Sequence, residues 1–518
     1  MAELGDDALD NRDDRKHPEG SDDDNDDNEC LPSHTLFLRR ALRASIKTLN
    51  ECPKIDWEKL RVDVDSKELL KEARQRRQEA LQDFYSRHVS TLHDLSGSED
   101  DGKEQLQAPS VDMIEQLSDI SPRVFYQRYQ QGNVPCLVRC IDDPHYFGYV
   151  QSCLSTTSHE QNDTNDLQLS PCTFVNREWF LQHVGADTVV PVRYDPTSYK
   201  QALLDKEGRA NECQVVEMKL QEWIALVDRL ETDDQQPVKS SYYLKDWHLV
   251  ALLESKDELP HPLYRVPKHF GKDLLAMMNS YSDGDYFFCY WGPPGSKTSI
   301  HSDVLNSFSW SLNICGWKKW SFYPPTLELT LQERHLRYDD TCLVLYQRPG
   351  ELIFVPAGWK HDVVNGKPET LSINHNWITT ANIDLVWEVL QSEMKSINEE
   401  LAKWKSCDNS ADADMEAHES MLRGCTGLDV SAYFAMILVG IKCSVVSLTE
   451  KGERFGVDKD TITDERRDLI CLLGALRRLV DTDSVQLNQR LVATLKHDKL
   501  VSDIMILISS LLGSWQPT

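Results

Sequence analysis

The chain has 518 residues, of which 40% are hydrophobic and 27% are charged, and its 84 acidic side chains outnumber the 56 basic ones. This apolar fraction is enough for a sizeable core and excludes a chain that is disordered throughout. The net charge of −28 argues against nonspecific binding to DNA or to an anionic membrane, since both require a basic surface. The acidic N-terminus lacks an apolar signal segment, and the apolar runs fall short of the roughly 20 residues that span a bilayer. We therefore expect a soluble, cytoplasmic protein that binds neither membrane nor nucleic acid directly, with nuclear presence left open.

The fourteen cysteines do not suggest a disulfide framework. They are spread along a long chain from Cys30 to Cys471, and no Cys-x-x-Cys pair occurs. Several of them lie within apolar runs, where a free cysteine behaves as a small hydrophobic residue. Reduced, buried thiols are therefore expected rather than disulfides or a zinc site.

The N-terminal part of the chain differs in composition from the rest. Residues 1–30 hold thirteen acidic side chains against three basic ones, which predicts a disordered segment. From Leu36 to Leu95 apolar residues recur at three- and four-residue steps amid Lys, Arg and Glu, which predicts helix with a solvated face. The polar stretch around Ser96 to Gln107 predicts a linker. Residues 31–107 are therefore expected to form a helical N-terminal extension and linker.

The central part of the chain is rich in predicted strands. Short apolar runs are dense between Tyr286 and Trp377, with turn signals between them, and this density predicts a double-sheet jelly roll or cupin barrel within residues 108–380. Residues 381–518 are predicted to be helical, so the fold class is mixed α and β. The predicted strands are Pro135–Val138, Val189–Val192, Tyr242–Leu244, Tyr286–Trp291, Phe308–Ile314, Trp320–Tyr323 and Leu352–Val355. The predicted C-terminal helices are Val386–Trp404, Tyr433–Val446, Arg466–Val480 and Leu487–Leu512.

A candidate metal site begins with His301 and Asp303. Residues two apart in a strand face the same way, so this imidazole and this carboxylate project together from one face. They supply two of the three ligands of the facial triad found in non-haem Fe(II) oxygenases. Taken alone, a His-x-Asp pair is common and weak support for a metal site.

Two histidines compete for the third ligand position. His375 shares its strand face with Ile373 and Trp377, which indicates a packed core position. His361 follows a predicted strand and a Pro-Ala-Gly turn, where the backbone can direct a side chain into the mouth of a barrel. We therefore predict His361 as the third ligand.

A predicted inward-facing lysine supports this interpretation. Alternation places Lys318 on the apolar face with Trp320 and Phe322, whereas Lys319 lies on the other face. A buried lysine is costly unless it meets an anion; the alternative is a lysine that reaches the solvent at the end of the barrel. A dicarboxylic cosubstrate beside the metal explains it better, and the hydroxyl of Thr298 is placed to contact the same carboxylate.

Several linked motifs together resemble the JmjC family of 2-oxoglutarate- and Fe(II)-dependent oxygenases. The matching segments are Gly-Pro-Pro-Gly-Ser at 292–296, His-Ser-Asp at 301–303, Cys-Gly-Trp-Lys-Lys-Trp at 315–320, the run 349–359 with His361, and Ser-Ile-Asn-His-Asn-Trp at 372–377. The resemblance covers residues 111–380 closely and the helical C-terminal region loosely. The segment Tyr-Leu-Lys-Asp-Trp-His-Leu at 243–249 points within the family to enzymes that hydroxylate a lysyl side chain of the class-one translation release factor.

This resemblance implies a double-stranded β-helix that binds Fe(II) through His301, Asp303 and His361. It also implies that 2-oxoglutarate is held by Lys318 and Thr298, and it adds Asn376, which matches a cosubstrate-binding position of the family. Dioxygen and 2-oxoglutarate would then be consumed in the hydroxylation of a protein substrate, the release factor, which would promote translation termination.

Two other functions stay open at this point. One is a JmjC histone lysine demethylase, although no zinc finger or chromatin-reading domain is visible in the sequence. The other is a barrel that binds partners without catalysis, against which the intact ligand set and the intact Lys318 argue.

Overall fold

A computed structural model describes most of the chain outside the first 30 residues. The described residues are 31–51, 57, 65–88, 92–94, 111–140, 144–156, 173–194, 214–232, 242–256, 259, 262–279, 286–323, 341–404, 411–450 and 464–513. The predicted acidic segment 1–30 and the predicted linker at 96–107 lie outside these residues.

The chain divides into two compact units that are interleaved along the sequence. The helical unit comprises Met1–Glu72, Asp273–Asp285 and Ile378–Thr518, and the barrel unit comprises Ala73–Lys272 and Tyr286–Trp377. The composition of the chain predicts four segments in chain order, with an N-terminal extension ending at residue 107. In the structure α1 (Ser33–Glu51) belongs to the helical unit, and α3 (Ser66–His88) begins in that unit and continues in the barrel unit.

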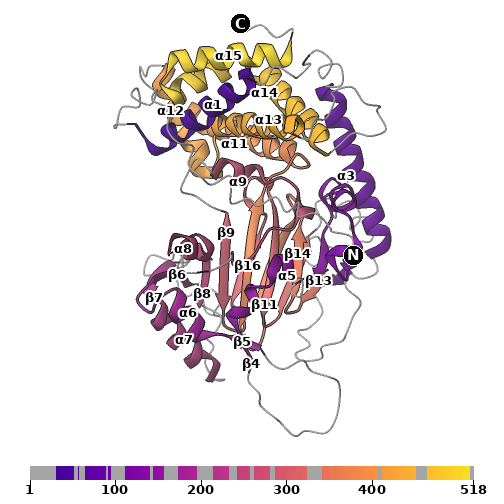
Figure 1. Cartoon of the computed structure of the whole chain (residues 1–518), viewed down its shortest axis with the longest axis vertical. Helices are drawn as coiled ribbons and strands as arrows, with labels where there is room; N and C mark the ends of the chain where they lie inside the picture. Colours follow the sequence, from indigo (N-terminus) through magenta and orange to yellow (C-terminus); the bar gives the residue numbers. More distant parts are fainter. Residues whose placement is uncertain are drawn as a thin grey trace. The chain divides into compact units, whose positions relative to one another are not determined.

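The barrel unit is built on two sheets that form a double-stranded β-helix (Figure 1). One sheet has the strand order β1 (Leu92–Asp94), β13 (Thr341–Gln347), β12 (Lys318–Tyr323), β15 (Lys360–Asn365), β10 (Lys297–His301). The larger sheet has the order β2 (Asp112–Ile114), β3 (Cys136–Arg139), β14 (Glu351–Val355), β11 (Phe308–Cys315), β16 (Thr370–Trp377), β9 (Phe287–Gly292), β8 (Tyr242–Trp247), β6 (Val189–Tyr194), β7 (Gln214–Lys219). Apart from the parallel pair β2 and β3, these strands pair antiparallel. The predicted fold class, a mixed α and β protein with a jelly-roll barrel and a helical C-terminal region, is confirmed.

Shorter elements flank the sheets of the barrel unit. They are η4 (Leu117–Asp119), α4 (Pro122–Phe125), η5 (Tyr126–Gln130), α5 (Pro144–Phe147), η6 (Val150–Cys153), the hairpin β4 (Leu154–Thr156) and β5 (Thr173–Val175), α6 (Arg177–His183), α7 (Leu220–Thr232), α8 (Leu249–Lys256), η9 (Lys268–Phe270) and η10 (Val304–Asn306).

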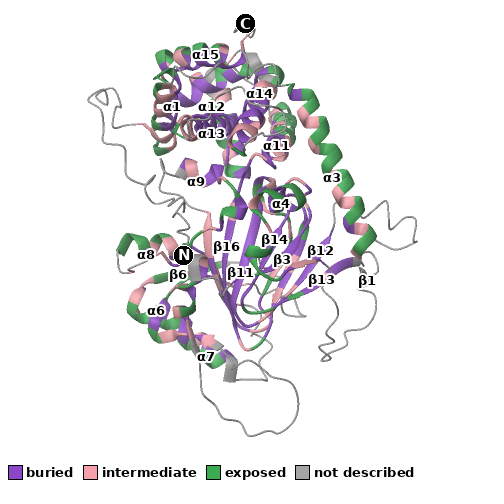
Figure 2. Cartoon of the chain, turned by 45° about the vertical axis from the view of Figure 1, so that its right-hand side comes forward, coloured by how far each residue is buried: buried purple, intermediate pink, exposed green. Residues whose placement is uncertain are grey.

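Aromatic side chains fill the space on the core side of the larger sheet. Strands β11, β14 and β16 are buried along nearly their whole length (Figure 2). The Trp310 ring is fully buried, stacks on Phe270 at 6.0 Å between centroids and meets Tyr264 edge-on. The indole N–H of Trp377 donates to the carbonyl of Phe270. Each such aromatic side chain buries roughly 150–250 Å², so this cluster fixes the sheet that carries the candidate site.

The helical unit contains one core helix surrounded by others. Its elements are α1, α9 (Leu274–Asn279), α11 (Ile383–Trp404), α12 (Ala411–Thr426), α13 (Val430–Glu450), α14 (Asp464–Leu495) and α15 (Asp498–Leu512). Helix α13 is long and apolar enough to cross a membrane, so the prediction that every apolar run falls short of a membrane span is wrong here. However, 78% of its most apolar window is buried inside the structure, which is the burial of a core helix in a bundle.

One predicted helix is two helices in the structure. The prediction ran from Leu487 to Leu512 without a break, but α14 ends at Leu495 and α15 begins at Asp498. Lys496 adopts a left-handed backbone conformation with φ of 50°, and the His497 ring accepts from the backbone N–H of Leu500 as an N-cap. Neither residue is a typical helix breaker, so the apolar pattern alone extended the helix too far.

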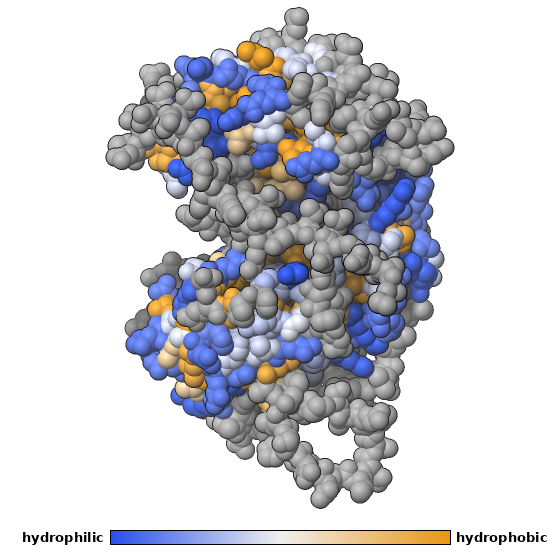
Figure 3. Space-filling model, viewed as in Figure 1, coloured by the Kyte–Doolittle hydropathy of each residue, from blue (hydrophilic) through white to orange (hydrophobic). Residues whose placement is uncertain are grey.

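The N-terminal helices are held by specific contacts. The buried guanidinium of Arg39 in α1 donates to the carbonyls of Leu495 and Lys496 at the end of α14, at 2.8 and 2.9 Å. Terminal carbonyls of a helix need such donors, so α1 completes the helical unit. Most of α3 is exposed and hydrophilic (Figure 3), as predicted for a solvated face.

A half-buried carboxylate joins α3 to the first strands of the barrel unit. Asp112 accepts from Arg128 at 2.9 Å, from the Tyr129 hydroxyl at 3.2 Å and from Arg87, and it lies 3.2 Å from Nε2 of His88. Burial opposes the charge of Asp112, but its hydrogen bond with His88 and the two guanidinium groups lower the pKa of Asp112 to about 2. The carboxylate is therefore a stabilising contact only while it is ionised.

We expect Asp112→Asn to destabilise the protein by about 2 kcal/mol at pH 7, since one pKa unit corresponds to about 1.4 kcal/mol. The stabilisation is complete above the unfolded-state pKa near 4 and is lost as the pH falls to about 2. Urea unfolding of both proteins should therefore give midpoints that converge on acidification. Glu115→Gln, an exposed carboxylate paired with Arg139, is the control and should change stability by less than about 1 kcal/mol. Equal effects of the two substitutions would contradict the stabilising role of Asp112.

Candidate metal centre

Strand pairing brings the three predicted metal ligands together. His301 is the last residue of β10 and lies opposite His361 of β15, with a register shift between Thr298 and His301. Asp303 follows two residues later in the connection to η10. One potential ligand atom from each side chain lies within 4.8 Å of the other two, and the two imidazole centroids are 4.4 Å apart.

Both histidines present the same ring nitrogen to the centre of this cluster. Nδ1 of His301 lies 2.9 Å from the carbonyl oxygen of Ser299, and Nδ1 of His361 lies 3.0 Å from that of Trp359. A carbonyl only accepts, so Nδ1 of each ring carries a proton, and in the neutral tautomer with this proton Nε2 has the lone pair. This second contact orients a metal-binding histidine, which suits both rings to bind a divalent metal through Nε2.

The carboxylate of Asp303 is oriented in a similar way. Its Oδ2 accepts from the Ser309 hydroxyl at 2.5 Å, while Oδ1 lies 4.0 Å from Nε2 of His301. The hydroxyl leaves Oδ1 available to a ligand. Two imidazole nitrogens and one carboxylate oxygen are the donor set of non-haem Fe(II) sites, so the residues present fit this metal.

The loops beside the cluster have constrained backbones. Leu305 and Asn306, two and three residues after Asp303, have φ values of 60° and 49°, which are unusual for residues other than glycine. Gly358, at φ of 74° in the turn before His361, lies against the Asn306 side chain: a Cβ there would be 3.2 Å from its Oδ1. Strained backbone of this kind persists where the surrounding packing requires it and is frequent at functional sites.

Lys318 faces the interior of the barrel, as its strand pattern predicts. It is 1% exposed and lies opposite Asn365, while Phe322 on the same strand lies opposite His361. In the described part of the chain its Nζ donates to the Ser372 hydroxyl of β16. Burial lowers the pKa of Lys318 to about 7. An ammonium with a neutral partner in such a place favours a bound anion.

The other two predicted cosubstrate residues lie on the same inner surfaces. Thr298 pairs with Val363, and Val363 lies on the same face of β15 as His361. On β16, Asn374 donates to the Ser372 hydroxyl at 3.1 Å, and Asn376 donates to the Ser307 hydroxyl at 3.1 Å. Asn376 lies opposite Ser309, the serine that contacts Asp303. The serine that contacts Lys318 is Ser372, four residues earlier on β16.

His375 lies on the opposite face of β16. It is 1% exposed, and its ring lies 4.0 Å from that of Phe287 and 5.4 Å from that of Trp310. It is therefore a core residue outside the His/Asp cluster, in agreement with the alternation in the sequence.

Sequence reasoning missed the supporting hydroxyl groups. Ser309 and Ser372 hold Asp303 and Lys318 from neighbouring strands. Alternation on each strand indicates which serines face inward, but only the register between strands shows which serine meets which charged group.

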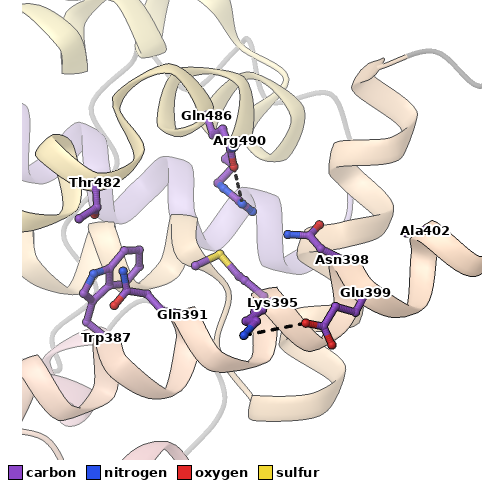
Figure 4. A pocket seen from close by; sticks show the side chains of 10 residues that line it. Trp387, Gln391, Lys395, Asn398, Glu399, Ala402, Thr482, Gln486 and Arg490 are labelled. Atoms are coloured by element: carbon purple, nitrogen blue, oxygen red, sulfur yellow. Dashed lines mark hydrogen bonds and ion pairs between the residues drawn. The ribbon is translucent and has the colours of Figure 1, made fainter.

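A separate pocket of about 500 Å³ lies in the helical unit between α11 and α14 (Figure 4). Trp387, Gln391 and Lys395 line it from α11, with Gln486 and Arg490 from α14. Lys395 pairs with Glu399, and Arg490 with Gln486. None of the predicted site residues lines this pocket.

Several known proteins are similar to this chain in sequence. The chain is 35% identical over 306 residues to the 2-oxoglutarate and iron-dependent oxygenase JMJD4 of Danio rerio, which covers 54% of this chain and 68% of that protein. It is 29% identical over 400 residues to the JMJD4 homolog of Drosophila melanogaster, covering 72% and 89% respectively. It is 28% identical over 150 residues to the bifunctional arginine demethylase and lysyl-hydroxylase psr-1 of Caenorhabditis briggsae, covering 24% and 38%.

No protein-family model matches the chain. The identity to the Danio rerio protein across two thirds of that protein's length is nevertheless sufficient to assign the chain to a family. The cofactors predicted from the sequence, Fe(II) and 2-oxoglutarate, are those of these relatives. This chain belongs to the JMJD4 family of 2-oxoglutarate and iron-dependent oxygenases.

Proposed function

We propose that this oxygenase hydroxylates a lysyl side chain of a protein, the class-one translation release factor, and that it does so in the cytoplasm to promote translation termination. The lysyl-hydroxylase name of one relative supports the reaction. The observation that carries the proposal is the set of three metal-binding side chains. In each of them the atom that is not needed for the metal, Nδ1 of a histidine or Oδ2 of Asp303, makes a hydrogen bond that fixes the side chain.

In this proposal His301, Asp303 and His361 hold Fe(II). Bound iron with 2-oxoglutarate and dioxygen supplies an oxidative decarboxylation, which yields succinate and hydroxylates a C–H bond. The Ser309 hydroxyl keeps the Asp303 carboxylate in its metal-binding orientation.

Lys318 pairs with the distal carboxylate of 2-oxoglutarate, with the hydroxyl of Thr298 beside it and with Asn376 at the edge of the pocket. The aromatic residues beside His361 exclude water from this end of the barrel: Trp320 and Phe322 are 4% and 0% exposed. Exclusion of water strengthens the charge pairing of Lys318 with the carboxylate.

Hydroxylation and demethylation are distinguishable by their products. We expect the purified chain to release succinate with the release factor and to add the mass of one oxygen atom to a lysine, without formaldehyde. Because relatives also carry the name arginine demethylase, methyl-arginine and methyl-lysine histone peptides are the comparison substrates. Formaldehyde release from those peptides, with no hydroxylation of the release factor, would contradict the proposal in favour of demethylation. Absence of turnover with every substrate would favour a binding module.

Removal of a metal ligand should abolish metal binding without unfolding the barrel. We expect Asp303→Ala and His361→Ala to bind no Fe(II) or Mn(II) in a calorimetric titration. His375→Ala should retain metal but lower the thermal midpoint, since a large-to-small substitution in a packed core costs about 2–5 kcal/mol. Metal retained by His361→Ala and lost by His375→Ala would reverse the assignment of the third ligand.

Replacement of Lys318 should separate stability from cosubstrate affinity. Lys318→Met keeps a packed side chain but removes the charge, and we expect 2-oxoglutarate affinity to fall by about 2–5 kcal/mol, the scale for one partner of a buried charge pair. Arginine should restore affinity only in part, because its planar fork needs different room. Lys319→Met, on the other face of β12, is the control. Equal losses at the two positions would contradict the assigned strand face.

The same substitution has a predicted pH dependence. The pKa of Lys318 falls from its ordinary 10.5 to about 7 in the folded protein, so the folded state binds fewer protons than the unfolded state between these values. Burial of the charge therefore costs most below pH 7 and nothing above 10.5. Without cosubstrate, Lys318→Met should be more stable than the wild type at pH 7, with a difference that shrinks as the pH rises. A difference that grows with pH would show that Lys318 has a carboxylate partner in the free protein.

A further inference from the structure

Strand β8 is irregular where it passes the candidate site. Its pairing with β9 shifts register between Leu244 and Trp247, and Asp246 within this bulge has a φ of 58°. A left-handed residue other than glycine costs of order 1–3 kcal/mol and persists only where its surroundings hold it. Bulges next to active sites commonly redirect a side chain.

The bulge directs two consecutive side chains to one partner. Neighbouring residues of a regular strand point to opposite faces, yet Lys245 and Asp246 both contact Tyr290 of β9. Nζ of Lys245 lies 5.4 Å from the centroid of the Tyr290 ring, and the Tyr290 hydroxyl donates to Oδ1 of Asp246 at 2.9 Å. Oδ2 of Asp246 accepts from Arg193 of β6 at 2.5 Å. Tyr290 is therefore held at both its ring and its hydroxyl.

Tyr290 joins the bulge to the proposed cosubstrate pocket. It lies opposite Ser372 in the pairing of β9 with β16, and Ser372 accepts from Nζ of Lys318. That same Nζ lies 5.9 Å from the centroid of the Tyr290 ring. Two ammonium groups thus approach one aromatic ring, Lys318 from β12 and Lys245 from the bulge.

The charge of Lys245 acts on Lys318, since the two ammonium groups lie 5.4 and 5.9 Å from the centroid of the same Tyr290 ring. Burial is the main cause that lowers the pKa of Lys318, and the Lys245 ammonium lowers it further. The repulsion between these two ammonium groups is relieved when an anion binds beside them.

We infer that the Lys245–Asp246 bulge is a positioning element for the dicarboxylate cosubstrate. Asp246 holds Tyr290 as a wall of the pocket, and Lys245 supplies a second cation beside Lys318. The inference rests on the proposed function of this pocket, and it adds Lys245, Asp246 and Tyr290 to the residues that position the cosubstrate.

The test measures the dissociation constant of 2-oxoglutarate by calorimetry on the full chain loaded with Mn(II). Asp246→Ala and Tyr290→Phe should each raise it about tenfold, the scale of a hydrogen bond to a charged group, and the double variant should be no worse than either single one. Lys245→Met should also raise it about tenfold, and Lys245→Arg should restore most of the affinity. With 2-oxobutyrate, which has one carboxylate, the effect of Lys245→Met should be smaller.

Tyr242→Phe is the matched control, since Tyr242 lies on the same strand but packs on Tyr194 with 4.8 Å between ring centroids. It should leave the dissociation constant unchanged. Additive effects of Asp246→Ala and Tyr290→Phe, or an unchanged constant in Lys245→Met, would overturn the inference. Tyr290→Phe removes one hydroxyl only, so it keeps the test decisive if Asp246→Ala does not fold. Failure of the wild type to bind Mn(II) would instead contradict the proposed function.

Discussion

The candidate site depends on the pairing of β10 with β15. This antiparallel register places His301 opposite His361, and the connection that follows β10 adds Asp303. Because side chains alternate along a strand, a slip of one residue would turn either histidine out of the cluster. The backbone around these ligands is irregular, with a bulge in β10 and left-handed residues after Asp303. The cluster is therefore formed at the expense of regular strand geometry.

The neighbouring strands supply what the three side chains lack. Backbone carbonyls fix the protonated nitrogen of each histidine, and a serine of β11 fixes the carboxylate. Strand β12 adds Lys318, whose burial as an ammonium is unfavourable in the free protein. In the proposed function a carboxylate of the cosubstrate offsets this cost, so that some stability of the free barrel is lost in favour of affinity for an anion.

Stabilising contacts within each unit join residues that lie far apart in the sequence. Arg39 near the N-terminus meets the end of α14, and Asp112 gathers side chains from α3 and η5. These contacts make the helices before the barrel integral to the folded units. Composition could not reveal this, because a solvated helix and a docked helix carry similar patterns of charge.

The sequence by itself determined the strand-rich barrel, the helical C-terminal region and the inward faces of β12 and β16, because side-chain alternation and apolar periodicity are local properties. It also favoured His361 over His375 for the same reason. Only the tertiary structure decided which hydroxyl groups support Asp303 and Lys318, where α14 ends, and how the bulge at Asp246 meets Tyr290. These contacts join residues far apart in the chain, and their geometry depends on strand register and backbone conformation, which no local pattern specifies.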